Sequence, residues 1–450
     1  MDLHGDNRGA ERFSEVLRAL NRDRLPMLGR WLYLRHQGQL VSTPVVGEPI
    51  YGSNRVCFPL TFDDGLRWLV KIPINGTEGK WDAPSAWSFQ AEHRIMRALN
   101  AFTDVPVSEV IDFCPAPGDN LRCPYIIVSH PPGWPLYDIW FGHHLNGDDP
   151  EVNYARRVRI LDSIASAMVQ LGRFTTLTSG ISCYFRDGLY TKYYGRRRDY
   201  KAELDRTDED QSDGPIYIAQ PPLTDPKAYY TYMLDLHPET NSYQKCIVAL
   251  LRKLIDWIPE PEEGRRGQRF DLTIPYFDYQ DFIVSEEGDL RGIEWEGVAT
   301  LPRSVGSASY PTWLTRDWNP TIYKYEEPMD QGVKPKGGVW EDSPSCLAYW
   351  RQFYRYALAK HGGDDGRIDL CRRSLIARNL LIAAENPWCR SDIVRKVTME
   401  AWKRSGQDQE LVFEVIVERF IEEREGKGED PIIEALLHKG FDALLAEEIA

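Results

Sequence analysis

The chain is 450 residues long; 42 % of them are hydrophobic and 12 % aromatic, a composition that excludes an intrinsically disordered protein. Its 68 acidic residues outnumber its 54 basic ones, and the net charge of −14 argues against nucleic acid or an anionic membrane as the main partner, because phosphate groups are bound by clustered Lys and Arg. No segment approaches the roughly 18 apolar residues of a membrane helix, and the first residues lack the basic start and apolar core of a signal peptide, so we expect a soluble, cytoplasmic protein.

The first third of the chain is predicted to be a small sheet preceded by helices. Residues 11–36 carry apolar side chains at helical spacing and are expected to form one or two short helices. Two strand-like runs, at 55–62 and 66–73, flank Asp63-Asp64-Gly65, which is a good hairpin turn. One long helix and two further strands are expected after the hairpin, at residues 85–100, 106–113 and 125–129.

The pattern changes after Pro131-Pro132-Gly133-Trp134-Pro135, which interrupts it as a linker does. Most of the remaining chain is predicted to be helical, at about 153–177, 241–258, 343–361, 369–384, 391–404, 408–425 and 432–448. Residues 186–230 are polar and are expected to form a surface insertion, whereas 270–296 are expected to form two short strands joined at Glu287-Gly288-Asp289.

These elements predict an α+β, two-lobed, protein-kinase-like fold, with a small antiparallel sheet in the N-lobe and a larger helical C-lobe. We expect an N-terminal helical extension, a nucleotide-binding N-lobe, a C-lobe that carries the catalytic and metal loops, and an acidic helical tail, at residues 1–44, 45–132, 133–404 and 405–450.

A fold of this kind suggests phosphoryl transfer from a nucleotide, which needs a strand Lys held by a helix Glu, a carboxylate near the acceptor hydroxyl, and oxygen ligands for magnesium. Lys71 lies at the centre of the second hairpin strand, and Glu92 lies in the helix that follows. We predict that they pair and bind the phosphates. The alternative is a strand Lys that faces solvent and a surface Glu.

The segment before the hairpin is the candidate phosphate loop. It reads Val46-Gly47-Glu48-Pro49-Ile50-Tyr51-Gly52-Ser53-Asn54-Arg55, with Gly52 and Ser53 as the expected contacts to the nucleotide. Only two glycines are present, and Pro49 has no amide hydrogen to donate. An ordinary turn before a strand explains the segment equally well.

Two further segments carry a resemblance to a known family: Pro275-Tyr276-Phe277-Asp278-Tyr279-Gln280-Asp281-Phe282 and Gly292-Ile293-Glu294-Trp295-Glu296. They resemble the catalytic and metal-binding loops of the aminoglycoside phosphotransferase and choline kinase-like family, in particular its fungal members. Segments around Cys123-Pro124-Tyr125 and Tyr310-Pro311-Thr312 are similar to its hinge and to the part after its metal loop. The resemblance covers about residues 45–360 and implies ATP and Mg²⁺ as cofactors and a small hydroxylated or amino-alcohol substrate.

The three positions at which the family places its chemistry are all changed. The resemblance puts Tyr276 at the catalytic Asp position, Asp281 at the metal-binding Asn position and Glu294 at the second metal position. Asp281 and Glu294 keep oxygen ligands, which magnesium accepts. A phenol, with an ordinary pKa near 10, is a poor proton acceptor at neutral pH, and loss of a general base typically costs about 10²–10⁴ in rate.

Two functions therefore stay open. In the first, the chain is an ATP-dependent phosphotransferase in which Asp278 replaces the missing carboxylate; a structural role for Asp278 in the loop is the competing interpretation. In the second, the chain is a pseudokinase that binds a nucleotide, a ligand or a protein without efficient catalysis.

The acidity of the chain belongs mostly to its tail. Residues 405–450 hold 13 Asp and Glu against 4 Lys and Arg, a net charge of −9, which leaves −5 for the other 404 residues. We expect these acids to form the solvated face of the tail helices, with contact to a basic protein partner as the alternative.

Overall fold

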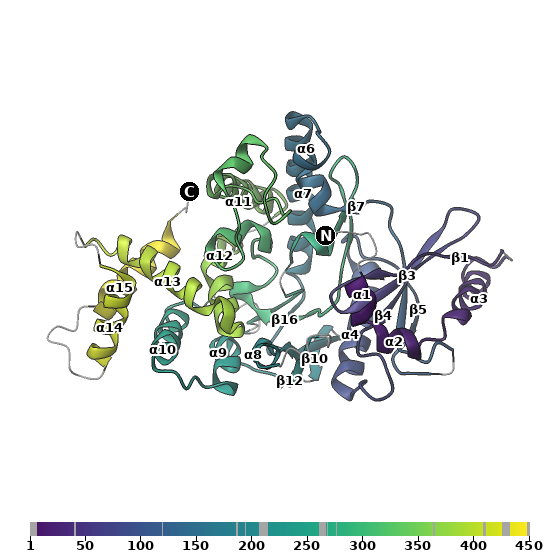
Figure 1. The fold of residues 1–450 in the computed structure, drawn as a ribbon, viewed down its shortest axis with the longest axis horizontal. Coiled ribbons are helices and arrows are strands. Elements are labelled where there is room, and N and C mark those ends of the chain that lie inside the picture. The colour runs from purple at the N-terminus through teal and green to yellow at the C-terminus, as the bar shows by residue number, and fades with distance from the viewer. Residues whose placement is uncertain are drawn as a thin grey trace. The chain divides into compact units, whose positions relative to one another are not determined.

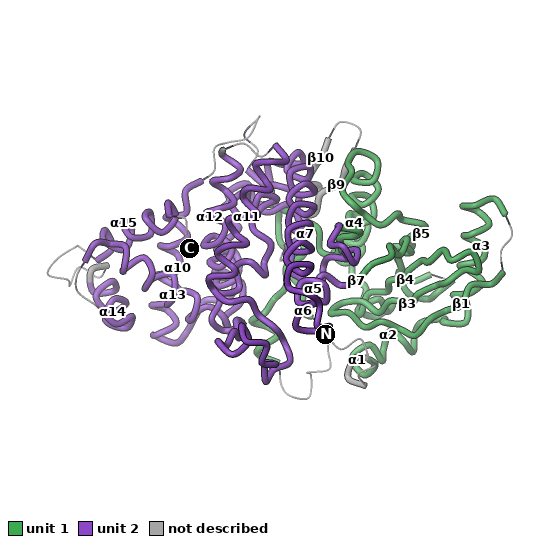
Figure 2. Tube along the Cα trace, turned by 90° about the horizontal axis from the view of Figure 1, so that it is seen from above, with its two compact units in different colours: residues 1–134, 180–222, 290–298 green, residues 135–179, 223–289, 299–450 purple. Residues whose placement is uncertain are grey.

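The computed structural model describes residues 7–39, 42–118, 120–185, 188–193, 195–206, 215–260, 267, 269–275, 277–362, 365–407, 411–424 and 433–447. The chain divides into two compact units, and each is assembled from several segments (Figure 2). Unit 1 contains Met1–Trp134, Gly180–Pro222 and Leu290–Val298, and unit 2 contains Pro135–Ser179, Leu223–Asp289 and Ala299–Ala450.

Unit 1 is built around an antiparallel sheet of strand order β1-β3-β4-β6-β5, with β2 paired to β3 (Figure 1). Its elements are α1 (Asn7–Arg12), α2 (Ser14–Ala19), α3 (Leu25–Gln37), β1 (Val45–Val46), β2 (Ile50–Tyr51), β3 (Arg55–Thr61), β4 (Arg67–Pro73), α4 (Ala83–Phe102), β5 (Val110–Cys114), β6 (Tyr125–Ser129), β9 (Ile181–Phe185), β10 (Gly188–Tyr193), β11 (Gly195–Arg198), α8 (Tyr200–Leu204), β12 (Tyr217–Gln220) and β15 (Leu290–Ile293). The predicted hairpin is confirmed, with Cys57 opposite Lys71.

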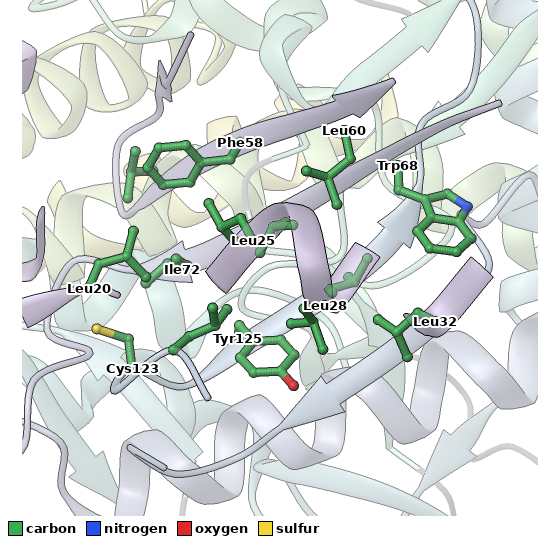
Figure 3. Close-up of a cluster of buried hydrophobic side chains, with 14 of the residues drawn as sticks. Leu20, Leu25, Leu28, Leu32, Phe58, Leu60, Trp68, Ile72, Cys123 and Tyr125 are labelled. Carbon is green, nitrogen blue, oxygen red and sulfur yellow. The ribbon is translucent and has the colours of Figure 1, made fainter. Parts of the chain in front are cut away.

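The alternation of side chains along the strands gives the sheet two different faces. One face is apolar, and helices α2 and α3 cover it, so that Leu25 and Leu32 pack with Phe58 and Trp68 (Figure 3). Tyr33 also contacts Trp68. The N-terminal helices thus shield this face of the sheet, which would otherwise expose a continuous apolar surface to water.

Helix α4 lies along the opposite face. It begins at the Asp82 cap, whose carboxylate accepts from the backbone N–H of Ser85 at 2.9 Å. Its Phe89 ring lies 5.1 Å from the Phe113 ring of β5, and His93 stacks on the same ring at 4.3 Å between centroids. The helix also contacts β9 and β11. The strands from the segment that was expected to be a surface insertion of the C-lobe therefore belong to unit 1.

Unit 2 is mainly helical. A chain in which an antiparallel sheet is followed by helices confirms the predicted α+β class. Its elements are α5 (Leu136–Trp140), α6 (Gly142–Leu145), α7 (Pro150–Leu171), β8 (Thr175–Thr176), α9 (Pro226–Leu236), α10 (Ser242–Asp256), β13 (Phe270–Thr273), β14 (Phe282–Val284), β16 (Ala299–Pro302), α11 (Pro344–Lys360), α12 (Asp365–Glu385), α13 (Pro387–Arg404), α14 (Phe413–Arg424) and α15 (Ile433–Ala446). A 3₁₀ turn at Tyr279–Asp281 precedes β14. Among the described helices, none is long and apolar enough to cross a bilayer.

The two tail helices are part of the unit 2 core. Helix α15 packs on α13, and α14 contacts α10 and α15. Their inward side chains, Ile416, Phe420, Leu437 and Phe441, are buried, whereas Glu414 and Glu418 are exposed. Within the described residues of α14 and α15, the helices are thus amphipathic, with Glu414 and Glu418 on the solvated side.

Candidate active site

Unit 1 contains a cluster of charged side chains on the sheet face that α4 covers. Lys71 of β4 is 9 % exposed, and its ammonium group forms an ion pair with Glu294, just beyond the end of β15. Burial by itself lowers the pKa of Lys71, but the Glu294 carboxylate outweighs it, so the pKa is raised. Burial raises the pKa of Glu294, but Lys71 and Arg55 reverse this and leave it lowered. Both groups are therefore ionised at neutral pH.

The predicted Lys71–Glu92 pair is wrong. Glu92 of α4, which is 3 % exposed, accepts two hydrogen bonds from the guanidinium of Arg55, at 2.7 Å from Nη1 and 2.5 Å from Nη2. A planar guanidinium matches both carboxylate oxygens, whereas an ammonium group is a single point charge, so the fork geometry favours Arg55 as the partner of Glu92.

Arg55 connects this pair to a second carboxylate. Its Nε lies 3.3 Å from Glu296, two residues after Glu294. Burial lowers the pKa of Arg55, but Glu296 and Glu92 outweigh it, and the guanidinium stays charged. The Arg196 guanidinium of β11, which stacks on Tyr217 at 3.7 Å, also feels the field of Glu296. Arg55 thus pairs with Glu92 and Glu296, and Lys71 pairs with Glu294.

In the segment that was predicted to hold phosphates, both glycine amides already donate hydrogen bonds to backbone carbonyls. The Gly47 N–H donates to the carbonyl of Pro59 at 2.8 Å, and the Gly52 N–H donates to the carbonyl of Arg55 at 2.9 Å. The first bond continues the pairing of β1 with β3, and the second closes the turn between β2 and β3. Ser53 is exposed. The roles of Gly52 and Ser53 toward a nucleotide stay predictions, but an amide that already donates to the backbone makes a poor phosphate ligand.

The loop that was predicted to be catalytic lies in unit 2. Tyr276 is outside the described residues. Asp278 and Asp281 form a capping box around the 3₁₀ turn: the Asp281 carboxylate accepts from the Asp278 N–H at 2.8 Å, and Asp278 Oδ1 accepts from the Tyr279 N–H at 2.8 Å. Each carboxylate therefore uses one oxygen to hold the loop.

Asp278 also belongs to an ionic network. Its Oδ2 lies 3.5 Å from Arg316, whose guanidinium binds Glu341 at 2.5 Å. Burial raises the pKa of Asp278, and Arg316 opposes that rise only in part. Next to it, Tyr279 stacks on Trp313 with 5.0 Å between ring centroids. Asp278 therefore has the structural role that the sequence left open, because its carboxylate binds the loop backbone and Arg316.

No group of three or more metal-binding side chains occurs among the described residues. Asp281 and Glu294 belong to different units, and their shared role as magnesium ligands stays a prediction.

Several members of these clusters were missed from the sequence, namely Arg55, Glu296, Arg316 and Glu341. Arg55 had a usable signal: the hairpin turn sets Cys57 opposite Lys71, and residue 55 shares the face of residue 57. Arg316 and Glu341 had none, because they lie 25 positions apart in a stretch of 3₁₀ turns and irregular chain that has no periodic pattern.

Comparisons with known proteins find similar structures but no similar sequence. No family model matches the chain, and no curated protein matches it. A protein of Ralstonia eutropha JMP134, assigned as an aminoglycoside phosphotransferase, is 13 % identical, with a TM-score of 0.44 and coverage of 94 % of this chain and 98 % of that one. A thermostable mutant of aminoglycoside phosphotransferase APH(4)-Ia, bound to AMP-PNP and hygromycin B, is 12 % identical, with a TM-score of 0.41 and coverage of 93 % and 97 %. Macrolide 2'-phosphotransferase MphH from Brachybacterium faecium is 14 % identical, with a TM-score of 0.37 and coverage of 81 % and 96 %. These values assign neither substrate nor activity, so function is argued from the chain's own residues.

Proposed function

We propose that this chain is a phosphotransferase-like protein that binds ATP with magnesium at the Lys71–Glu294 pair and transfers a phosphoryl group to a hydroxyl of a small molecule. The observation that carries the proposal is the pair itself: a buried strand lysine that meets a carboxylate 223 residues later in the chain. The sequence resemblance to the aminoglycoside phosphotransferase and choline kinase-like family, with its fungal members, supports the same reading.

The pair suits an exchange of partners. Lys71 has a side chain only 11 % exposed, so its charge needs a nearby anion, whereas the Glu294 side chain is 34 % exposed and accessible to solvent. A phosphate can take the place of Glu294 at Lys71, and a hard cation can take the place of Lys71 at Glu294. Both charges then stay compensated. The ionised Glu294 carboxylate fits magnesium and would hold it. Bound magnesium would neutralise charge on the phosphates.

The pairing of Glu92 with Arg55 leaves Lys71 available for this exchange. In the expected arrangement one lysine would serve both the helix and the nucleotide. Here Arg55 holds α4 through two hydrogen bonds, and Lys71 can leave Glu294 without loosening that helix.

A pseudokinase that binds nucleotide without efficient transfer is the second candidate, and two observations favour it. The Gly47 and Gly52 amides donate to backbone carbonyls. Asp278, the nearest described carboxylate to the Tyr276 position, is bound to Arg316 and to its own loop.

Calorimetry with ATP, with and without magnesium, tests binding in the wild type and in Lys71→Met and Glu294→Gln. ATP at a hundred times its Kd would stabilise the fold by about 2.7 kcal/mol, which a thermal shift detects. Lys360→Met is the matched control, because Lys360 is an exposed lysine paired with Asp162. Binding that requires Lys71 and that magnesium strengthens only when Glu294 is present supports the site. Equal binding by all four proteins, or none by the wild type, contradicts it.

Turnover decides between the two candidates. Phosphate transfer to a panel of alcohols and aminoglycosides is measured with the wild type and with Tyr276→Asp. Transfer by the wild type supports the phosphotransferase. Binding without transfer supports the pseudokinase, and activity gained in Tyr276→Asp would identify the missing general base as its cause.

A further inference from the structure

Helix α3 has an outer face that the fold of unit 1 does not use. Its inner residues, such as Leu25, Leu28 and Leu32, belong to the core beneath the sheet. On its outer side Met27 is 58 % exposed, and Trp31 and Leu34 are 54 % and 40 % exposed. These three are spaced four and three residues apart and form one apolar stripe along the helix. Figure 1 shows α3 beside β1, at the edge of unit 1.

Arginines border this stripe on both sides. Arg30 and Arg35 are exposed and fall to either side of it at helical spacing, and the Arg35 guanidinium lies 5.5 Å from the centre of the Trp31 ring. Residues 22–37 contain four arginines and one aspartate, a net charge of +3, and the neighbouring Asp63-Asp64 turn, whose Asp64 accepts from Tyr33 of α3, lowers this to +1, within a chain whose net charge is −14. The local charge is what a surface within one Debye length, about 8 Å at physiological salt, experiences.

We propose that the outer face of α3 is a docking surface for an anionic lipid bilayer, held at the headgroup level. A Trp and two long apolar side chains flanked by Arg are the composition of helices that lie in a membrane interface. The flanking arginines complement anionic headgroups. This surface is separate from the charged cluster around Lys71, which lies on the other face of the sheet.

The size of the stripe argues against a second copy of the chain as its occupant. The exposed parts of its three apolar side chains amount to on the order of 300 Å². A stable protein interface buries roughly 800 Å² on each partner. A bilayer needs no complementary groove, and electrostatic attraction adds to a small apolar contact.

Co-sedimentation of the full-length protein with vesicles tests the proposal. Vesicles of phosphatidylcholine and phosphatidylserine in a three-to-one ratio should bind the wild type, and pure phosphatidylcholine vesicles should bind it far less. Each arginine contributes roughly fivefold to such binding, so Arg30→Gln/Arg35→Gln should weaken it about 25-fold. Trp31→Ala should weaken it by at least about tenfold. Raising the salt concentration should weaken vesicle binding by the wild type and weaken binding by the double variant less.

Matched controls come from unit 2. Trp388 is 66 % exposed without an apolar stripe, and Arg173 and Arg419 are exposed arginines. Trp388→Ala and Arg173→Gln/Arg419→Gln should bind as the wild type does, and all variants should keep its Tm, because only surface positions change. The proposal is overturned if the wild type does not bind anionic vesicles, or if the α3 variants and the controls weaken binding equally. It is also overturned if analytical ultracentrifugation shows a dimer that Trp31→Ala dissolves, because the face then binds another copy.

Discussion

Removing either side of the Arg55–Glu92 pair should destabilise unit 1, and the two removals should differ. Arg55 is 7 % exposed and Glu92 is 3 % exposed, so a charge left alone there is poorly solvated. Breaking a buried ion pair from one side typically costs about 3–5 kcal/mol. After Glu92→Gln, Arg55 keeps Glu296 at 3.3 Å, and the amide can still accept one hydrogen bond. After Arg55→Met, both Glu92 and Glu296 lose their guanidinium.

We therefore expect Arg55→Met to cost about 4–5 kcal/mol and Glu92→Gln about 3 kcal/mol. Urea denaturation followed by circular dichroism measures the midpoint. Amide hydrogen exchange of α4 peptides reports on unit 1 alone, which is needed because two units need not unfold together. The double variant Arg55→Met/Glu92→Leu removes both charges of the pair and should be more stable than Arg55→Met.

The exposed pair Arg395–Glu414 provides the control, and Arg395→Met should leave the midpoint unchanged. The reasoning is refuted if Arg55→Met leaves α4 exchange at the wild-type level. It is equally refuted if Glu92→Gln is the more harmful of the two, because Glu296 would then contribute nothing.

Three further outcomes are expected. Burial, together with the neighbouring Arg97 and Arg94, lowers the pKa of His93 from 6.5 to about 4. Because the unfolded chain then binds the proton at a higher pH than the folded chain does, stability should fall as the pH drops from 6.5 toward 4. The urea midpoint of His93→Gln should fall less steeply over the same pH range. A Cβ at Gly440 would lie 1.8 Å from the Ala401 carbonyl oxygen, so Gly440→Ala should force α15 away from α13 and cost about 2 kcal/mol or more of stability. Gly337 has open space around it, so the control Gly337→Ala should leave the urea midpoint unchanged. Asp278→Asn keeps an acceptor for the loop amide and should change the free energy of unfolding by less than about 1 kcal/mol. It should abolish phosphate transfer if Asp278 is the relocated carboxylate, whereas unchanged transfer would leave Asp278 with its structural role alone.

The elements of this fold could largely be predicted from the sequence because they depend on local patterns. Alternating apolar residues around Asp63-Asp64-Gly65 predicted the hairpin, and helical spacing predicted α7, α10 and the two tail helices. The strands in the segment at 186–230 could not be predicted from local patterns, because they are short and polar. Its β11 pairs with β12 about 20 residues later, and β11 also contacts α4, a segment about 100 residues earlier in the chain.

Within the candidate site, residue types could be read from the sequence, but partners could not. The sequence determined that Lys71 lies on a strand, that Glu92 lies on a helix and that Glu294 lies near a late hairpin. Only the tertiary structure decided that Arg55 takes Glu92 and that Lys71 takes Glu294. The physical reason is that a buried charge binds whichever opposite charge offers the best geometry in three dimensions, and a guanidinium fork fits a carboxylate better than an ammonium group does.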